Sequence, residues 1–130
     1  MCENSAGADL DLPADLSAAR RARTFLRDRS CPEHGGDVLD QALLAVSELA
    51  VNAVEHGAPP VRAHVDCRGG VLHLEVSDGS PALPRCTSPE PSAESGRGVG
   101  LVAALAADWG VRRGGSGQRP GKTVWCDLGG

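Results

Sequence analysis

A carboxylate and a carboxamide stand one helical turn apart in an otherwise apolar stretch of this chain. Glu48 and Asn52 are four positions apart, and either Glu55 or His56 extends the same face by a further turn. Polar side chains on a mostly buried helix cost free energy unless a polar group meets them. A hydrated metal–nucleotide would meet both side chains, and a polar stripe facing solvent is the alternative interpretation.

A run of alternating glycines, Gly96-Arg97-Gly98-Val99-Gly100, directly precedes an apolar segment from Leu101 to Ala107 that predicts a short helix. Backbone N–H groups at a helix N-terminus suit phosphate. A flexible hinge is a common alternative for such a run. The spacing differs from that of a dinucleotide-binding turn, and no strand leads directly into it.

Two further polar positions stand at predicted strand ends. Asp78 precedes a Gly-Ser-Pro turn, where it is either an ordinary turn residue or an acceptor for the amino group of adenine. Gly121-Lys122-Thr123 looks like the tail of a P-loop, but Ser116 stands where that loop requires its first glycine. We therefore predict a strand start there, with Thr123 at the floor of a pocket.

Composition excludes several classes of protein. The net charge of -4 argues against a general nucleic-acid binder. The five cysteines are odd in number and widely spaced, which favours reduced thiols in the cytoplasm over a disulfide framework. A zinc site at His64 and His73 is disfavoured, because Cys67 should point to the other face of its strand. The first 30 residues hold no signal-peptide pattern, and no segment approaches a membrane span.

Helical periodicity predicts two helices in the first half of the chain. Asp15 is a candidate N-cap for the first helix, which ends at Cys31-Pro32. The predicted inward face of this helix holds Leu16, Ala19, Ala22, Phe25 and Leu26. Asp37 caps the second helix, which carries Glu48 and Asn52 and ends at Gly57.

Alternating apolar residues predict strands in the remainder. A hairpin turns at Arg68-Gly69-Gly70, between strands that include Val61 to Cys67 and Leu72 to Val76. The other predicted strands are an edge strand at Leu10 to Leu12 and two closing strands, Trp109 to Arg113 and Lys122 to Leu128. This order predicts an α/β two-layer sandwich with a mixed, mostly antiparallel sheet and helices on one face.

The length of 130 residues predicts a single domain over residues 1–130, with residues 1–9 as a loose start. The segment from Ser80 to Ser95 is rich in proline and serine and has almost no apolar rhythm. A loop of this length in a compact domain is usually functional or mobile.

The order of these motifs resembles the GHKL (histidine kinase-like) ATPase superfamily, and the bacterial anti-sigma-factor serine kinases look closest within it. The stretch from Ser47 to Gly57 is similar to the N box of these proteins, and the resemblance spans roughly Leu10 to Leu128. It implies a Bergerat-type ATP-binding fold, with ATP and Mg²⁺ as cofactors.

The resemblance also implies a role for each motif. Asn52 would coordinate Mg²⁺ through its side-chain oxygen, and Glu48 would be the general base toward a protein serine hydroxyl. Asp78 and Gly79 would meet the adenine, supported by Thr123. Residues 80–97 would form the ATP lid. The phosphates would be bound by the glycine-rich segment made of Gly96, Arg97, Gly98, Val99, Gly100 and Leu101.

The chain departs from the superfamily at one motif. Asp78-Gly79-Ser80-Pro81-Ala82 stands where the wider family has Asp-x-Gly-x-Gly, so the two later glycines are absent. Asp78 keeps its implied role, and the lid hinge should be stiffer.

Two functions are therefore expected to compete. One is an ATP-dependent serine/threonine kinase that phosphorylates an antagonist protein and sequesters a sigma factor, regulating transcription. The other is an ATP-responsive binding switch without phosphotransfer. Both imply a cytoplasmic protein with those two partners and a possible homodimer, and neither implies direct contact with nucleic acid or a membrane.

Overall fold

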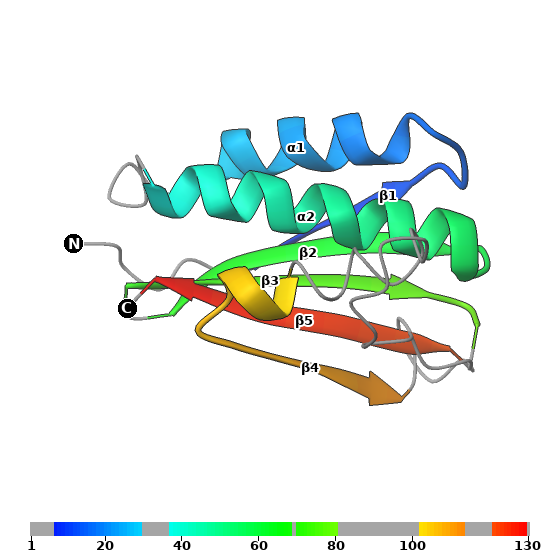
Figure 1. Ribbon diagram of the computed structural model, residues 1–130. Coiled ribbons are helices and arrows are strands. Elements are labelled where there is room, and N and C mark those ends of the chain that lie inside the picture. Colours follow the sequence, from blue (N-terminus) through cyan, green and yellow to red (C-terminus); the bar gives the residue numbers. More distant parts are fainter. Residues whose placement is uncertain (1–6, 30–36, 69, 81–101, 114–120, 130) are drawn as a thin grey trace.

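The computed structural model describes residues 7–29, 37–68, 70–80, 102–113 and 121–129 (Figure 1). Two long helices are described, α1 (Ala18–Arg29) and α2 (Asp37–His56). A further helical turn covers residues 102–105. The strands are β1 (Ala8–Leu12), β2 (Val61–Arg68), β3 (Val71–Asp78), β4 (Asp108–Arg113) and β5 (Lys122–Gly129).

The strands form one five-stranded sheet in the order β1-β2-β3-β5-β4. Each pairing between neighbouring strands is antiparallel. Figure 1 shows α1 and α2 side by side over one face of this sheet. The two-layer sandwich expected from the sequence is therefore confirmed, and β3 occupies the centre of the sheet.

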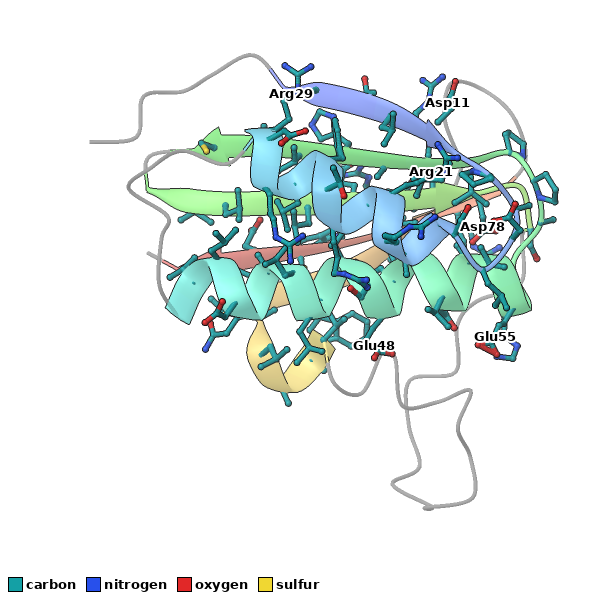
Figure 2. All side chains as sticks on the ribbon, turned by 90° about the horizontal axis from the view of Figure 1, so that it is seen from above. Asp11, Arg21, Arg29, Glu48, Glu55 and Asp78 are labelled. Atoms are coloured by element: carbon teal, nitrogen blue, oxygen red, sulfur yellow. The ribbon has the colours of Figure 1, made fainter. Side chains whose placement is uncertain are left out.

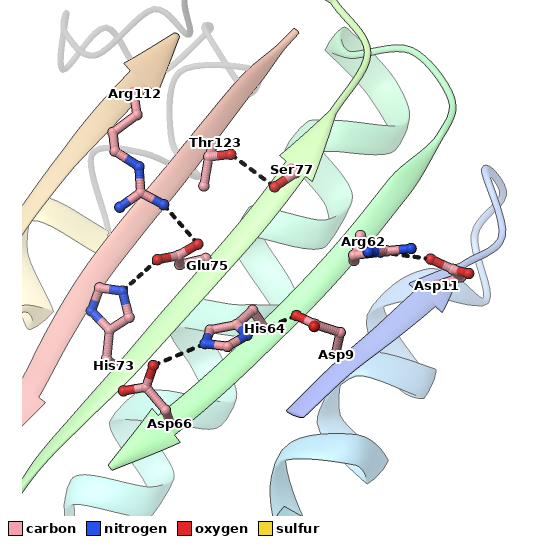
Figure 3. A network of polar contacts seen from close by, with 10 residues as sticks. All are labelled: Asp9, Asp11, Arg62, His64, Asp66, His73, Glu75, Ser77, Arg112 and Thr123. Carbon is pink, nitrogen blue, oxygen red and sulfur yellow. Dashed lines mark hydrogen bonds and ion pairs between the residues drawn. The ribbon is translucent and has the colours of Figure 1, made fainter. Parts of the chain in front are cut away.

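Side-chain alternation along the strands divides the sheet into two faces. Leu72, Leu74 and Val76 of β3 are at most 2% exposed and belong to the core beneath the helices. The residues between them, among them His73 and Glu75, lie on the other face, which we call the open face (Figure 3). This face lies away from α1 and α2, and its polar side chains pair across neighbouring strands.

The start of α1 confirms one expectation and corrects another. Asp15 lies in a turn just before α1, and its Oδ1 accepts hydrogen bonds from the backbone N and the Oγ of Ser17 at 2.8 and 2.6 Å, a capping contact at the entry to the helix. These hydrogen bonds lower the pKa of Asp15. The prediction that Leu16 belongs to the inward face is wrong, because Leu16 is 87% exposed. It precedes the regular helix, and Ala18 takes the buried position instead.

Histidine–carboxylate contacts dominate the open face (Figure 3). Both ring nitrogens of His73 contact carboxylates: Nε2 lies 2.7 Å from Glu75, and Nδ1 contacts Asp127. His64 contacts Asp9 through Nδ1 at 2.7 Å and Asp66 through Nε2 at 2.8 Å. Each ring nitrogen of the two histidines therefore has a carboxylate partner within the protein, so neither imidazole needs a ligand to complete its hydrogen bonds.

The same contacts set the charge of Glu75. Its hydrogen bond with His73 outweighs the effect of burial and, together with Arg112 at 2.8 Å, holds the pKa of Glu75 at about 2. Glu75 therefore remains ionised throughout the physiological pH range.

The described cysteines lie in the core. Cys67 and Cys126 are both buried, and burial raises the pKa of Cys126 to about 12. Cys67 pairs with Leu72 on the helix-covered face, away from His64, as expected.

In the part of the chain that the structure describes, no group of three or more potential metal-ligating His, Cys, Asp or Glu residues occurs. Within the same part, no helix is long and apolar enough to cross a membrane.

Candidate functional site

The polar positions of α2 differ in their burial. Asn52 is only 7% exposed, and Glu48, one turn earlier, is half-buried. Among the described residues, neither side chain has a hydrogen-bond partner. Glu55 and His56 at the end of the helix are exposed. No buried side-chain N or O atom among the described residues lacks a hydrogen-bond partner, so the unpaired amide atoms of Asn52 still reach the surface, where a ligand can contact them.

The neighbours of Asn52 explain why it is buried. Leu49 and Ala53 hold α2 against the sheet, and both belong to the core. In Figure 2, Glu48 and Glu55 project from the edge of α2 that faces away from α1. The helical turn at residues 102–105 lies on that side of α2 in both views (Figures 1 and 2).

Asp78 ends β3 near the C-terminal end of α2 and is 3% exposed. Its carboxylate forms an ion pair with the ammonium group of Lys122, at 3.1 Å from Oδ2 and 3.2 Å from Oδ1. The backbone N of Ser80 donates a further hydrogen bond to Oδ1 at 2.8 Å. Lys122 is 2% exposed, so both charges of this pair are withdrawn from water.

Three glycines surround Asp78, and each leaves no room for a side chain. A Cβ at Gly57 would lie 2.5 Å from Cγ of Asp78 and 2.6 Å from its Oδ2. A Cβ at Gly121, whose φ is 145°, would lie 2.2 Å from the backbone O of Asp78. A Cβ at Gly79 would lie 2.4 Å from the backbone O of Pro59. Gly57 therefore leaves space for the carboxylate itself, whereas Gly121 and Gly79 allow the close approach of the backbone around Asp78.

Thr123 does not join Asp78. In the register of β3 and β5, Thr123 pairs with Ser77, and Asp78 pairs with Lys122. The hydroxyl groups of Thr123 and Ser77 lie 2.8 Å apart on the open face (Figure 3). The residue that meets Asp78 from β5 is Lys122, not the Thr123 that the sequence suggested for the pocket floor.

Lys122 and Gly57 were missed as site residues. The alternation of Val124, Cys126 and Leu128 already placed Lys122 on the apolar face, because side chains two positions apart share a face. Gly57 was interpreted only as a helix terminator. Its second role, leaving space for Asp78, depends on a tertiary contact that no local pattern encodes.

The predicted phosphate-binding segment lies outside the described residues. This applies to Gly96, Arg97, Gly98, Val99, Gly100 and Leu101, and to all of the predicted lid except Ser80. The described chain resumes with the helical turn at 102–105, where Val102 is fully buried in the core. The predicted helix up to Ala107 is shorter than expected, because residues 106 and 107 are not helical.

The structure thus places a carboxamide and a half-buried carboxylate in the second half of α2, and a buried charge pair at the ends of β3 and β5 beside the C-terminal end of that helix. These groups can bind a metal ion through oxygen, accept a proton, and form hydrogen bonds with a heterocyclic base.

Solved structures provide the first comparison. One is a Mycobacterium tuberculosis protein described as the RsbU and RsbW domains of Rv1364c, with 22% identity and a TM-score of 0.62. The match covers 95% of this chain and 32% of that one, so the chain spans about a third of that structure. Another is the histidine kinase domain of the blue-light activated histidine kinase from Erythrobacter litoralis EL346, with 22% identity and a TM-score of 0.53. That match covers 88% of this chain and 60% of the kinase structure. These likenesses establish the fold.

A comparison with curated proteins gave no significant match. A family model described as the histidine kinase-like ATPase domain matches residues 12–126, which include both helices, three of the five strands in full and most of β5. The chain therefore belongs to the histidine kinase-like ATPase family.

Proposed function

We propose that this protein binds Mg·ATP at the end of α2 and acts as an anti-sigma factor that phosphorylates a serine of an antagonist protein. The observation that carries the nucleotide site is Asn52, a residue that is only 7% exposed and whose carboxamide lacks a protein partner among the described residues. Membership of the ATPase family supplies the nucleotide class.

The residues fit a magnesium ion. Mg²⁺ prefers hard oxygen ligands and usually binds through one or two protein groups together with phosphate oxygens and water. The side-chain oxygen of Asn52 is one such ligand, and its lack of a hydrogen bond leaves it available. When bound, the ion would neutralise charge on the phosphates during transfer.

Glu48 would accept the proton of the incoming serine hydroxyl. It lies one turn before Asn52, and within the described chain its carboxylate is not engaged in a hydrogen bond or ion pair. A carboxylate in that state can accept a proton without first breaking a protein contact. Phosphoryl transfer depends mainly on positioning and charge stabilisation. The base would therefore assist a reaction that depends chiefly on how the nucleotide is held.

On the same proposal, residues 1–130 act as one nucleotide-binding domain, with a lid at 80–97 and the phosphates bound by residues 96–101. The antagonist protein and a sigma factor would be the partners, in the cytoplasm, and a homodimer is a further expectation. The structural likeness to a protein containing an RsbW domain supports placing this chain among such regulators.

The test of the nucleotide site is calorimetric titration with Mg·ADP. Replacing Asn52 by Ala should weaken the affinity about tenfold or more, equivalent to about 1.4 kcal/mol for a lost ligand bond. Glu55→Gln is the matched control, because Glu55 lies on the same helix and is exposed. Unchanged affinity in Asn52→Ala would remove Asn52 from the metal site.

A binding switch without transfer is the second candidate. It is favoured by Ser80, Pro81 and Ala82, which replace the flexible glycine motif at the start of the lid. Ser80 still donates its backbone N–H to Asp78, so the turn itself tolerates the change. Incubation with radiolabelled ATP and the co-purified antagonist separates the candidates, because a switch would leave the antagonist unlabelled.

A further inference from the structure

Lys122 is a charged residue on a face of β5 where the other side chains are apolar. It stands in line with Val124, Cys126 and Leu128 on the helix-covered face, and it is 2% exposed. A buried ammonium group is strongly unfavourable without a counter-ion, and here Asp78 provides one at 3.1 Å. Such pairs add little net stability compared with apolar residues of similar size. A role in recognition would explain why a charged pair occupies this position.

The Asp78–Lys122 pair does not use all of its hydrogen-bond donors and acceptors. A carboxylate offers about four acceptor sites and an ammonium group three donors. Asp78 accepts two hydrogen bonds at Oδ1, from Lys122 and Ser80, and one contact with Lys122 at Oδ2. One acceptor site on Oδ2 and one donor on Nζ remain, on atoms that lie 3.1 Å apart. Within the described residues, neither side chain makes any further contact.

We propose that Lys122 is a base-recognition residue that works together with Asp78. Asp78 Oδ2 accepts a hydrogen bond from the exocyclic amino group of adenine, while Lys122 Nζ donates to the adjacent ring nitrogen N1. Adenine presents this donor and acceptor side by side on one edge, which matches the unused acceptor and donor of the pair. The proposal rests on the nucleotide site proposed above and adds a second base contact to it.

Gly57 supports this assignment. A Cβ there would lie 2.6 Å from Oδ2, the oxygen with the unused acceptor site. Glycine at this position therefore keeps a side chain away from the oxygen that the amino group has to reach. Lys122 is chemically distinct from Thr123, whose hydroxyl lies on the open face against Ser77 and is directed away from this oxygen.

The test compares two nucleotides in two proteins by calorimetry: ADP and 1-deaza-ADP, in which a C–H replaces N1, with the natural chain and Lys122→Met. In the natural chain, 1-deaza-ADP should bind about tenfold more weakly than ADP, equivalent to about 1.4 kcal/mol. In Lys122→Met, the two nucleotides should bind within about twofold of each other, because the donor to N1 is gone. Lys122→Arg keeps a donor and should restore part of the discrimination.

Lys122→Met leaves the Asp78 carboxylate buried without a counter-ion, so it can fail to fold. If Lys122→Met does not fold, the double variant Lys122→Met with Asp78→Asn takes its place, because it removes both charges. The comparison of the two nucleotides in the natural chain needs no variant at all.

The outcomes separate the two proposals. Equal affinity of the natural chain for ADP and 1-deaza-ADP overturns the role of Lys122 and leaves the nucleotide site standing. A Lys122→Met protein that binds both nucleotides more weakly, with their ratio unchanged, overturns it as well, because Lys122 then acts only through the structure. No binding of either nucleotide by the natural chain overturns both proposals.

Discussion

Two buried polar side chains, His73 on the open face and Asn52 on α2, are similarly hidden from water but very different in their contacts. His73 is 3% exposed and meets a carboxylate at each ring nitrogen. Asn52 is 7% exposed and has no hydrogen-bond partner among the described residues. Burial alone therefore does not mark a functional residue in this protein.

The difference lies in the hydrogen-bonding capacity that each region leaves unused. On the open face, charged neighbours on adjacent strands satisfy one another and stabilise the sheet. Around Asn52, Glu48 and the Asp78–Lys122 pair, donors and acceptors remain available to a ligand. Substitutions in the first region should therefore change stability and leave binding unchanged. Substitutions of Glu48 or Asn52 should do the reverse, and breaking the buried Asp78–Lys122 pair should affect both.

The largest effect is expected at Glu48. If the chain is a kinase, Glu48→Gln should reduce the rate of phosphotransfer by roughly 10²- to 10⁴-fold, the usual contribution of a positioned base. Affinity for Mg·ADP should stay within a few fold, and the free energy of unfolding should change by less than about 0.5 kcal/mol, since no protein contact is lost. Radiolabelled ATP measures transfer, and Glu55→Gln is the control. An equal loss of binding and transfer would assign Glu48 to the metal or the fold.

His73→Leu should show the opposite pattern. The change leaves the carboxylates of Glu75 and Asp127 close together without the imidazole between them, and should lower the free energy of unfolding by about 3 kcal/mol. Affinity for Mg·ADP, measured on the folded protein, should not change. Urea denaturation provides the measurement. Ser77→Ala, which removes one neutral hydrogen bond to Thr123, should lower the free energy of unfolding by only about 1 kcal/mol. A marked loss of ADP affinity in His73→Leu would contradict the division between the two regions.

Gly57→Ala should weaken ADP binding about tenfold, or about 1.4 kcal/mol, because the new Cβ displaces the carboxylate of Asp78 and also crowds the backbone O of Ala53 at 2.5 Å, at the end of α2. Gly70→Ala is a matched control from the β2–β3 turn. Its φ of 91° also disfavours alanine, but a Cβ there would meet nothing within 4 Å. Calorimetry on both variants should show weaker binding only in Gly57→Ala, and equal affinities would argue that the space beside Asp78 is not part of the binding site.

The smallest effect concerns pH and His64. Burial opposes protonation of the ring, but hydrogen bonds with Asp66 and Asp9 outweigh it, so the pKa of His64 is raised above 6.5. The stabilisation from this contact is therefore complete below about pH 6.5 and is lost as the pH rises through the raised pKa. The ring is a quarter exposed, so solvent screening should keep the effect below about 1 kcal/mol. The difference in unfolding free energy between the natural chain and His64→Gln should shrink from pH 6 toward higher pH. A difference that grows with pH would contradict this sign.

The sequence predicted the elements well where a local pattern determines them. The confirmed elements include α2 from Asp37 to His56, the β2–β3 hairpin and the strand around Leu10 to Leu12. That strand begins at Ala8, so the predicted loose start over residues 1–9 is wrong for Ala8 and Asp9, which pair with β2. Leu16 was misplaced because a helical pattern does not reveal that the first regular turn begins at Ala18. Glu48, Asn52 and Asp78 were proposed as candidates from their types, their spacing and the family resemblance, and their roles stay predictions.

Contacts between strands far apart in the sequence were harder to predict. Lys122 was overlooked because the interpretation followed a family motif to Thr123, although the period of two along β5 favoured Lys122 for the helix-covered face. The histidine–carboxylate contacts depend on the exact register between strands, as in His73 opposite Asp127. A single strand does not reveal which residue of a distant strand it will face.

The strand order also determines when, during synthesis, the proposed base-recognition pair of Asp78 and Lys122 can form. β2 and β3 pair as a local hairpin, but β3 reaches its other neighbour, β5, across 43 intervening residues between Asp78 and Lys122. Pairings that close long loops form late, because their entropic cost precedes their contacts. A nascent chain that has emerged only as far as Gly121 can form the hairpin and carries Asp78, but its counter-ion is still inside the ribosome. The capacity to discriminate a base would thus arise only with the last strand of the sheet.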